Sequence, residues 1–167
     1  MDISEVRGQL GEQVCRDILF VHAILGCDTT SRLFGFGKAT ALSFIQEDKC
    51  FREQVAVFSQ IGYSASEISD AGEKALMCLY KAKHVKNLNT LRYQKFQELL
   101  RTSKKAIHPK SLPPTSATAK YHSLRKYHQV QTRRGVELSA EDWGWKVAEG
   151  KMTPVQNYLE SIYHVHL

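Results

Sequence analysis

Apolar residues recur along this chain at helical spacings of three and four, and glycines and capping residues separate one apolar stripe from the next. The first stripe runs over residues 12–25, from Val14 through Ile18 to Leu25, and Gly26 follows it. No alternating run rich in Val, Ile and Thr is long enough to predict a strand firmly. The pattern therefore predicts a mainly α, irregular multi-helix domain with few or no strands.

Further helices follow from the same periodicity and from capping residues. Ser64 and Glu67 have the spacing of a capping box, and Gly72 weakens the first turns of that helix, so a later start stays open. The expected helices cover 37–47, 50–60, Ser64 to Tyr80, 91–100, and from a cap at Thr115 to about Arg134, before Gly135. Short strands could lie in 1–3 and 147–155.

Composition restricts the class of protein. The chain has 167 residues, of which 43% are hydrophobic, and this is enough apolar material for a globular domain. The longest apolar run, residues 18–25, is far shorter than the ~20 residues of a membrane span, and acidic residues lie where a secretion signal needs positive charge. We expect a soluble intracellular protein, with the nucleus favoured and no membrane partner.

Basic residues are concentrated in one part of the chain. Residues 99–136 contain nine Lys and Arg and no Asp or Glu, while the whole chain carries a net charge of only +6. Histidines and tyrosines are interspersed among them, a mixture that can meet phosphates by charge and bases by stacking. The alternative is a solvated helix face with a lysine-rich loop.

Four cysteines, Cys15, Cys27, Cys50 and Cys78, include no C-x-x-C pair that would indicate a structural zinc site. We expect reduced, mostly buried thiols.

The segment with most chemical content lies between Ile24 and Leu42. Asp28 follows the end of the first helix and precedes three hydroxyl residues, and a Gly35-Phe36-Gly37-Lys38 turn then opens the next helix. Paired glycines let a phosphate approach the backbone, and a helix amino terminus offers unpaired N–H groups. A Walker loop is excluded, because its spacing of glycines is absent and Ala39 follows the lysine.

These residues resemble the flap-endonuclease/XPG branch of the PIN-like nucleases, over about residues 1–47. In that family a helix ends in G-C-D or G-S-D, and a helix-turn-helix begins with a glycine turn and a basic residue. The resemblance implies that Asp28 is a metal-coordinating carboxylate for Mg²⁺ or Mn²⁺. It also implies that Gly35, Gly37 and Lys38 hold a DNA backbone, with a monovalent cation at the glycine turn.

A second resemblance spans nearly the whole chain. The motifs G-C-D-T-T-S at 26–31, L-P-P-T at 112–115 and D-W-G-W at 142–145 are similar to those of invertebrate proteins often associated with mobile elements, a group with no established activity. We accordingly divide the chain into three parts. Residues 1–98 form a helical PIN-like carboxy-terminal portion with the G-C-D-T-T-S and G-F-G-K motifs, 99–136 a basic loop and helix, and 137–167 a Trp-containing tail that packs on the helices.

The sequence offers few carboxylates that could hold catalytic metal ions. Two-metal cleavage of a phosphodiester needs several, which the related nucleases supply from strands amino-terminal to the G-C-D segment. Here only Asp28 matches a ligand position, and one carboxylate among neutral hydroxyls binds Mg²⁺ weakly.

Three interpretations follow. The first is a remnant of a flap-endonuclease-like nuclease that binds the nucleic-acid backbone, DNA being favoured, without catalysis. The second is a nuclease completed by missing amino-terminal carboxylates or by acidic residues of another chain, and the third is a helical protein-interaction module with no nucleic-acid role. The residues expected to bind nucleic acid are Arg32, Gly35, Gly37, Lys38, Lys120, Arg125 and Lys126.

Overall fold

The computed structural model describes residues 20, 23–24, 38–82 and 84–156 of the chain. The α-helices of this part are α3 (Lys38–Glu47), α4 (Lys49–Phe58), α5 (Ala65–Leu79), α6 (Leu88–Thr102) and α7 (Ser116–Arg133). Two 3₁₀ turns, η1 (Pro109–Ser111) and η2 (Ala140–Trp143), and the strands β1 (Trp145–Ala148) and β2 (Lys151–Pro154) complete it. The described chain is thus mainly helical, with one two-stranded antiparallel sheet, as the periodicity predicted.

Side chains cap the helices where the sequence indicated. Ser64 forms the predicted capping box, because its hydroxyl accepts from the Glu67 N–H and the Glu67 carboxylate accepts from the Ser64 N–H at 2.8 Å. Thr115 caps α7 through the N–H of Thr118. Asp48, which the sequence did not single out, caps α4 by accepting from the N–H of Phe51. Because these caps are local, each helix begins at a residue that its own sequence specifies.

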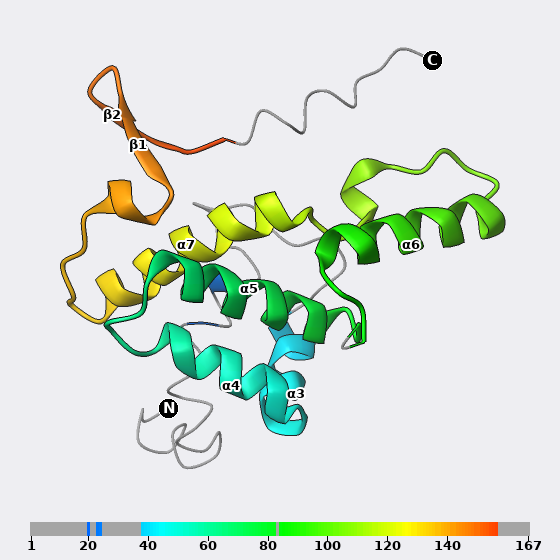
Figure 1. Cartoon of the computed structure of the whole chain (residues 1–167), viewed down its shortest axis with the longest axis horizontal. Coiled ribbons are helices and arrows are strands. Elements are labelled where there is room, and N and C mark those ends of the chain that lie inside the picture. The colour runs from blue at the N-terminus through cyan, green and yellow to red at the C-terminus, as the bar shows by residue number, and fades with distance from the viewer. Residues whose placement is uncertain (1–19, 21–22, 25–37, 83, 157–167) are drawn as a thin grey trace, which may run out of the picture.

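The core lies where α5 packs between α4 and α7 (Figure 1). Phe51, Val55 and Phe58, at helical spacings of four and three, form the buried face of α4. Aromatic rings continue this core towards the tail: the Phe58 ring centroid lies 6.3 Å from that of Tyr127, and Tyr127 lies 4.5 Å from Trp143. Burying such rings removes much apolar surface from water and joins segments far apart in sequence.

Close packing between α5 and α7 explains Gly72. The helix begins at Ala65, directly after its cap, so the later start considered from the sequence is wrong. A Cβ at Gly72 would lie 1.8 Å from the Ser123 Oγ and 2.4 Å from its Cβ, so only glycine allows this approach. The residue that weakens the helix locally is therefore the one that lets α7 pack against it.

Polar side chains of α7 bind the carboxyl-terminal end of α4. The Gln131 side-chain amide donates to the Phe58 carbonyl at 2.9 Å and the Gln60 carbonyl at 3.0 Å, and the Tyr127 hydroxyl also donates to Gln60. Arg134 donates to the Ser59 carbonyl. The last carbonyls of a helix have no partner within it, so α7 supplies donors that α4 lacks.

A second buried polar group lies in the middle of α7. The His122 side chain is 5% exposed, and its Nε2–H donates to the Ile24 carbonyl at 2.9 Å. Burial, and then the positive charges of Lys126 and Arg125, lower the pKa of His122 to about 3 although the hydrogen bond opposes them. The imidazole is consequently neutral in the folded protein at neutral pH.

The tail contains the strands that the sequence indicated only loosely. In the β1–β2 hairpin, Trp145 pairs with Pro154 and Val147 with Met152. The hairpin begins two residues before the predicted 147–155 region and otherwise lies within it. Glu149 and Gly150 both have positive φ, which a two-residue turn of this hand requires. The other expected strand, residues 1–3, lies outside the described residues, and none of the helices in the described part is long and apolar enough to cross a membrane.

Candidate nucleic-acid interface

The glycine segment is only partly within the described structure. Asp28, Arg32, Gly35 and Gly37 lie outside the described residues, so the expected metal and monovalent cation sites do too. Lys38 is the first described residue of α3, and its side chain is likewise outside what is described.

Lys120 and Arg125 on α7 have different surroundings. Lys120 is exposed, with its Nζ 5.8 Å from the centroid of the Tyr121 ring. Arg125 is half-buried: its Nη1 donates to the Val155 carbonyl at 3.4 Å, and its guanidinium lies 6.0 Å from the Trp145 ring centroid. Burial lowers the pKa of Arg125, but the guanidinium stays charged at neutral pH. Arg125 therefore attaches the hairpin to α7, whereas Lys120 faces solvent.

Lys126 does not lie on the surface that its charge suggested. The side chain has no exposed surface, because it belongs to the buried face of α7 with Ala119, Ser123 and Val130. These residues recur at helical spacings, which place Lys126 on the buried side of α7. A count of charges along the sequence does not reveal this. A folded chain cannot present this ammonium group to a phosphate, and Lys126 is removed from the candidate interface.

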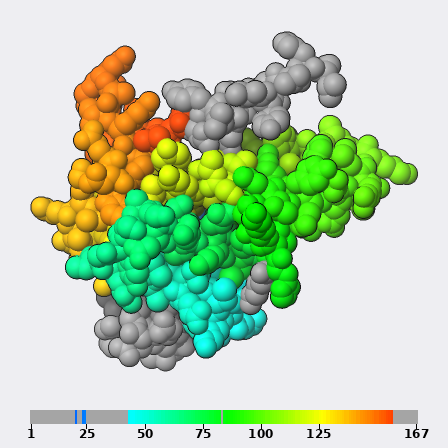
Figure 2. All heavy atoms as spheres, viewed as in Figure 1, coloured from blue at the N-terminus to red at the C-terminus, as the bar shows by residue number. Residues whose placement is uncertain are grey.

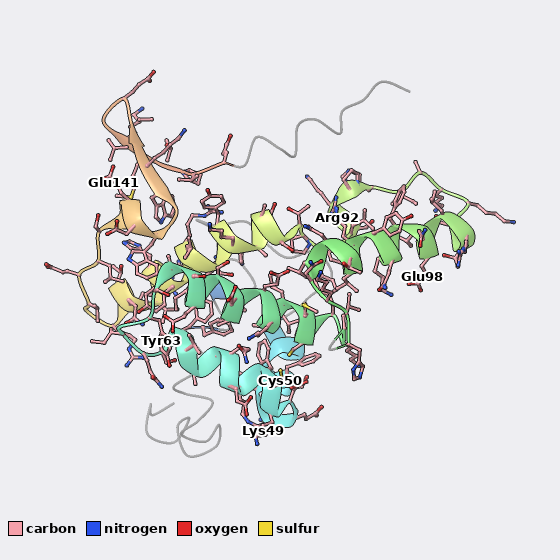
Figure 3. All side chains as sticks on the ribbon, in the orientation of Figure 1. Lys49, Cys50, Tyr63, Arg92, Glu98 and Glu141 are labelled. Atoms are coloured by element: carbon pink, nitrogen blue, oxygen red, sulfur yellow. The ribbon has the colours of Figure 1, made fainter. Side chains whose placement is uncertain are left out.

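Four of the exposed basic residues lie together on a projection from the body of the molecule. We define the basic arm as residues 93–111, which include most of α6, the loop after it and η1; it extends away from α4, α5 and α7 (Figures 1 and 2). Its exposed cations are Arg101, Lys104, Lys105 and Lys110. The single acid of the arm, Glu98 (labelled in Figure 3), is paired with Lys95 at 2.7 Å. The distal part of the arm thus carries positive charge alone.

Aromatic and apolar side chains of α6 are also exposed on the arm. Tyr93 is 61% exposed, Phe96 39% and Leu100 60%, although they lie in the apolar segment for which the sequence predicted a helix. Only Leu88 and Leu91 are buried, because α6 leaves the core after its first turn. The predicted helix is present, but most of its apolar stripe faces solvent.

One carboxylate fixes the base of the arm. Glu73 of α5 accepts from the Leu88 N–H at 2.8 Å, at the start of α6, and from the Ser116 hydroxyl at 2.7 Å, at the start of α7. Arg92, labelled in Figure 3, donates to the Pro113 carbonyl and so closes the return of the arm. Nothing in the sequence around Glu73 signals this role, because its partners lie 15 and 43 residues away.

A cluster of metal-ligand type occurs elsewhere in the described part. Asp48, Cys50 and Cys78 each offer one ligand atom, and these atoms lie within 4.8 Å of one another. Cys78 is buried and Cys50 half-buried, and no disulfide joins them. Cys15 and Cys27 lie outside the described residues. None of the cluster belongs to the residues that the sequence singled out for metal binding.

Comparison with models of protein families, with curated proteins and with solved structures gives no match to this chain. The resemblance to PIN-like nucleases therefore rests on the sequence motifs alone.

Proposed function

We propose that this protein binds the sugar–phosphate backbone of a nucleic acid, DNA being favoured, and does not cleave it by itself. The observation that carries the proposal is the basic arm, whose distal cations Arg101, Lys104, Lys105 and Lys110 are exposed and have no acid among them. A polyanion gains from such a surface by releasing its condensed counterions, whatever its sequence.

The same arm offers surfaces for unpaired bases. Tyr93 and Phe96 lie one turn apart on α6 and are both exposed, and aromatic faces stack on bases of any sequence. A single-stranded or branched polynucleotide therefore suits the arm better than an uninterrupted duplex. The Gly35–Lys38 turn would add a second backbone contact, if it acts as the resemblance implies.

The proposal excludes cleavage by the chain alone because of its carboxylates. Asp28 is the only residue that matches a metal-ligand position of the related nucleases, and cleavage with two metal ions needs several. Cleavage that depends on Mg²⁺ or Mn²⁺ and is lost in Asp28→Ala would contradict this part of the proposal and identify a nuclease.

Charge reversal on the arm tests the proposal. The full chain and the double variant Lys104→Glu/Lys105→Glu are titrated with fluorescent single-stranded and forked DNA from 50 to 200 mM salt. Losing two phosphate contacts should reduce the slope of log affinity against log salt by about 1.4 for single strands. Unrelated sequences should be affected equally, since backbone contacts carry no sequence information.

Lys49→Glu is the matched control. Lys49 is highly exposed on α4, far along the molecule from the arm (Figure 3), and its contact with Glu53 is long, at 3.9 Å. This variant makes the same type of charge change away from the arm. It should therefore alter the slope of log affinity against log salt much less than one substitution on the arm does. Equal weakening by the control, or affinity that does not change with salt, would refute phosphate binding by the arm. Lys38→Glu, made separately, tests the glycine turn.

A helical protein-interaction module is the second candidate. The exposed apolar side chains favour it: Leu100 on the arm is 60% exposed, and Val147 and Met152 on the hairpin are 59% and 58% exposed. Such side chains usually add surface for another protein and not for phosphate. Binding to DNA that is weak and insensitive to salt would favour this candidate over the first.

A further inference from the structure

Two cysteines from different helices meet at the boundary of α4 and α5. The Cys78 thiol donates to the Cys50 sulfur at an Sγ–Sγ distance of 3.2 Å, although the two residues are 28 positions apart. A disulfide has an S–S length of about 2.05 Å, so the sulfurs need to approach by only about 1 Å, which small side-chain rotations can supply. Figure 3 shows Cys50 near the start of α4, on the side towards α5.

The two sulfurs differ in their access to solvent. Cys78 is 2% exposed and belongs to the core, whereas Cys50 is half-buried in the first turn of α4. A small oxidant can therefore reach Cys50 first, and Cys78 is already in contact with it. This is the arrangement of a reacting thiol and a resolving thiol.

We propose that Cys50 and Cys78 are a peroxide-sensitive dithiol that closes reversibly to a disulfide between α4 and α5. The Cys50 thiolate attacks one oxygen of hydrogen peroxide, an S–O bond forms as the O–O bond breaks, and the leaving hydroxide is protonated to water. The Cys78 thiolate then attacks the Cys50 sulfur, forming the S–S bond and releasing the second oxygen as water. Two thiols and one peroxide thus give one disulfide and two water molecules.

This inference goes beyond nucleic-acid binding and does not depend on it. Neither cysteine belongs to the basic arm, and both lie in or next to the α4–α5 contact that holds the core together. Closing the pair ties two helices of the core across a 28-residue separation, so the oxidised chain should unfold at a higher denaturant concentration than the reduced one.

The test uses the full chain and peptide mapping. The protein is reduced, freed of metal by a chelator, exchanged into buffer without reductant, treated with hydrogen peroxide, alkylated and digested with trypsin. Cleavage after Lys49, Arg52, Lys74 and Lys81 gives one peptide for each cysteine, residues 50–52 and residues 75–81. We expect these two peptides joined, lighter than their sum by two hydrogens, and separated again by reductant.

Single variants assign the two roles. In Cys78→Ser the oxidised Cys50 has no resolving partner, so a sulfenic acid should accumulate there and be trapped by dimedone. In Cys50→Ser the buried Cys78 should stay unmodified. Where serine impairs folding, alanine at the same position serves, and the map of the unsubstituted chain needs no variant.

Three results would overturn the proposal. The first is that both thiols of the native protein stay free under peroxide. The second is that Cys50 or Cys78 joins Cys15 or Cys27 instead. The third is that Zn²⁺ added before the peroxide protects both thiols at stoichiometric amounts while the metal-free protein forms no disulfide, which would make Asp48, Cys50 and Cys78 a metal site.

Discussion

Replacing His122 by glutamine should remove a loss of stability that the unsubstituted chain suffers below pH 6.5. The folded pKa of His122 is about 3, because the ring is buried and lies near the positive charges of Lys126 and Arg125. In the unfolded chain its pKa is about 6.5. Between these values the unfolded state binds a proton that the folded state does not, so the free energy of unfolding falls as the pH falls.

The expected size follows from the same two pKa values. One pKa unit corresponds to about 1.4 kcal/mol, and the whole interval to roughly 5 kcal/mol at pH 3. Between pH 7 and pH 5, where the native fold should persist, the loss from His122 is about 2 kcal/mol. Solvent screens the charge of His122 very little, because this residue is only 5% exposed.

Urea unfolding at pH 7, 6 and 5 measures the effect. The His122→Gln variant is expected to lose about 2 kcal/mol less than the unsubstituted chain over this interval, since every other titrating group is common to both proteins. Glutamine keeps a donor for the Ile24 carbonyl, which limits the change at pH 7. Parallel pH profiles for the two proteins would refute the conclusion that His122 is folded in its neutral form.

Two further substitutions test the packing and capping of α5. Gly72→Ala should lower the free energy of unfolding by about 1–3 kcal/mol, because its Cβ would overlap the Ser123 side chain, and Ser123→Gly in the same chain should recover part of the loss; urea unfolding without any loss would show that the helices are not this close. Ser64→Ala should cost about 1 kcal/mol by the same assay, because the capping box is broken, whereas Ser66→Ala, an exposed position of the same helix, should cost much less; equal losses would argue against the cap.

Local signals predicted the helices well. The boundaries of α7 and the caps at Ser64 and Thr115 depend on residues within four positions of each other, so a single sequence contains the information. The buried face of α4 follows from its spacing for the same reason. The hairpin was less certain, because strands of four residues give too short an alternation to distinguish from a loop.

The surface could be predicted less well than the helices. Lys126 counts as positive charge in any sum over the sequence, and only its place on the buried face of α7 removes it from the surface. Phe96 and Leu100 have helical spacing, but within the described part of the chain α6 buries only Leu88 and Leu91, near its start. The charges and apolar spacings of a sequence do not indicate at which residue a helix leaves the core.

Contacts between distant residues could not be predicted at all. The Cys50–Cys78 pair spans 28 residues, and Glu73 meets Ser116 across 43. Which partners meet in such pairs depends on how α4, α5 and α7 pack, and no local pattern records that. The interface residues Lys120 and Arg125 were both singled out, but only the packing of the hairpin separates their roles.

The attachment of the arm at Glu73 has a consequence for how this protein can change. The described contacts that fix the arm lie at its base, where Glu73 meets the starts of α6 and α7 and Arg92 meets Pro113. Substitutions at the tip, among Arg101, Lys104 and Lys105, leave those contacts and the core intact. The charge of the tip can therefore evolve while the thermal tolerance of the body is conserved.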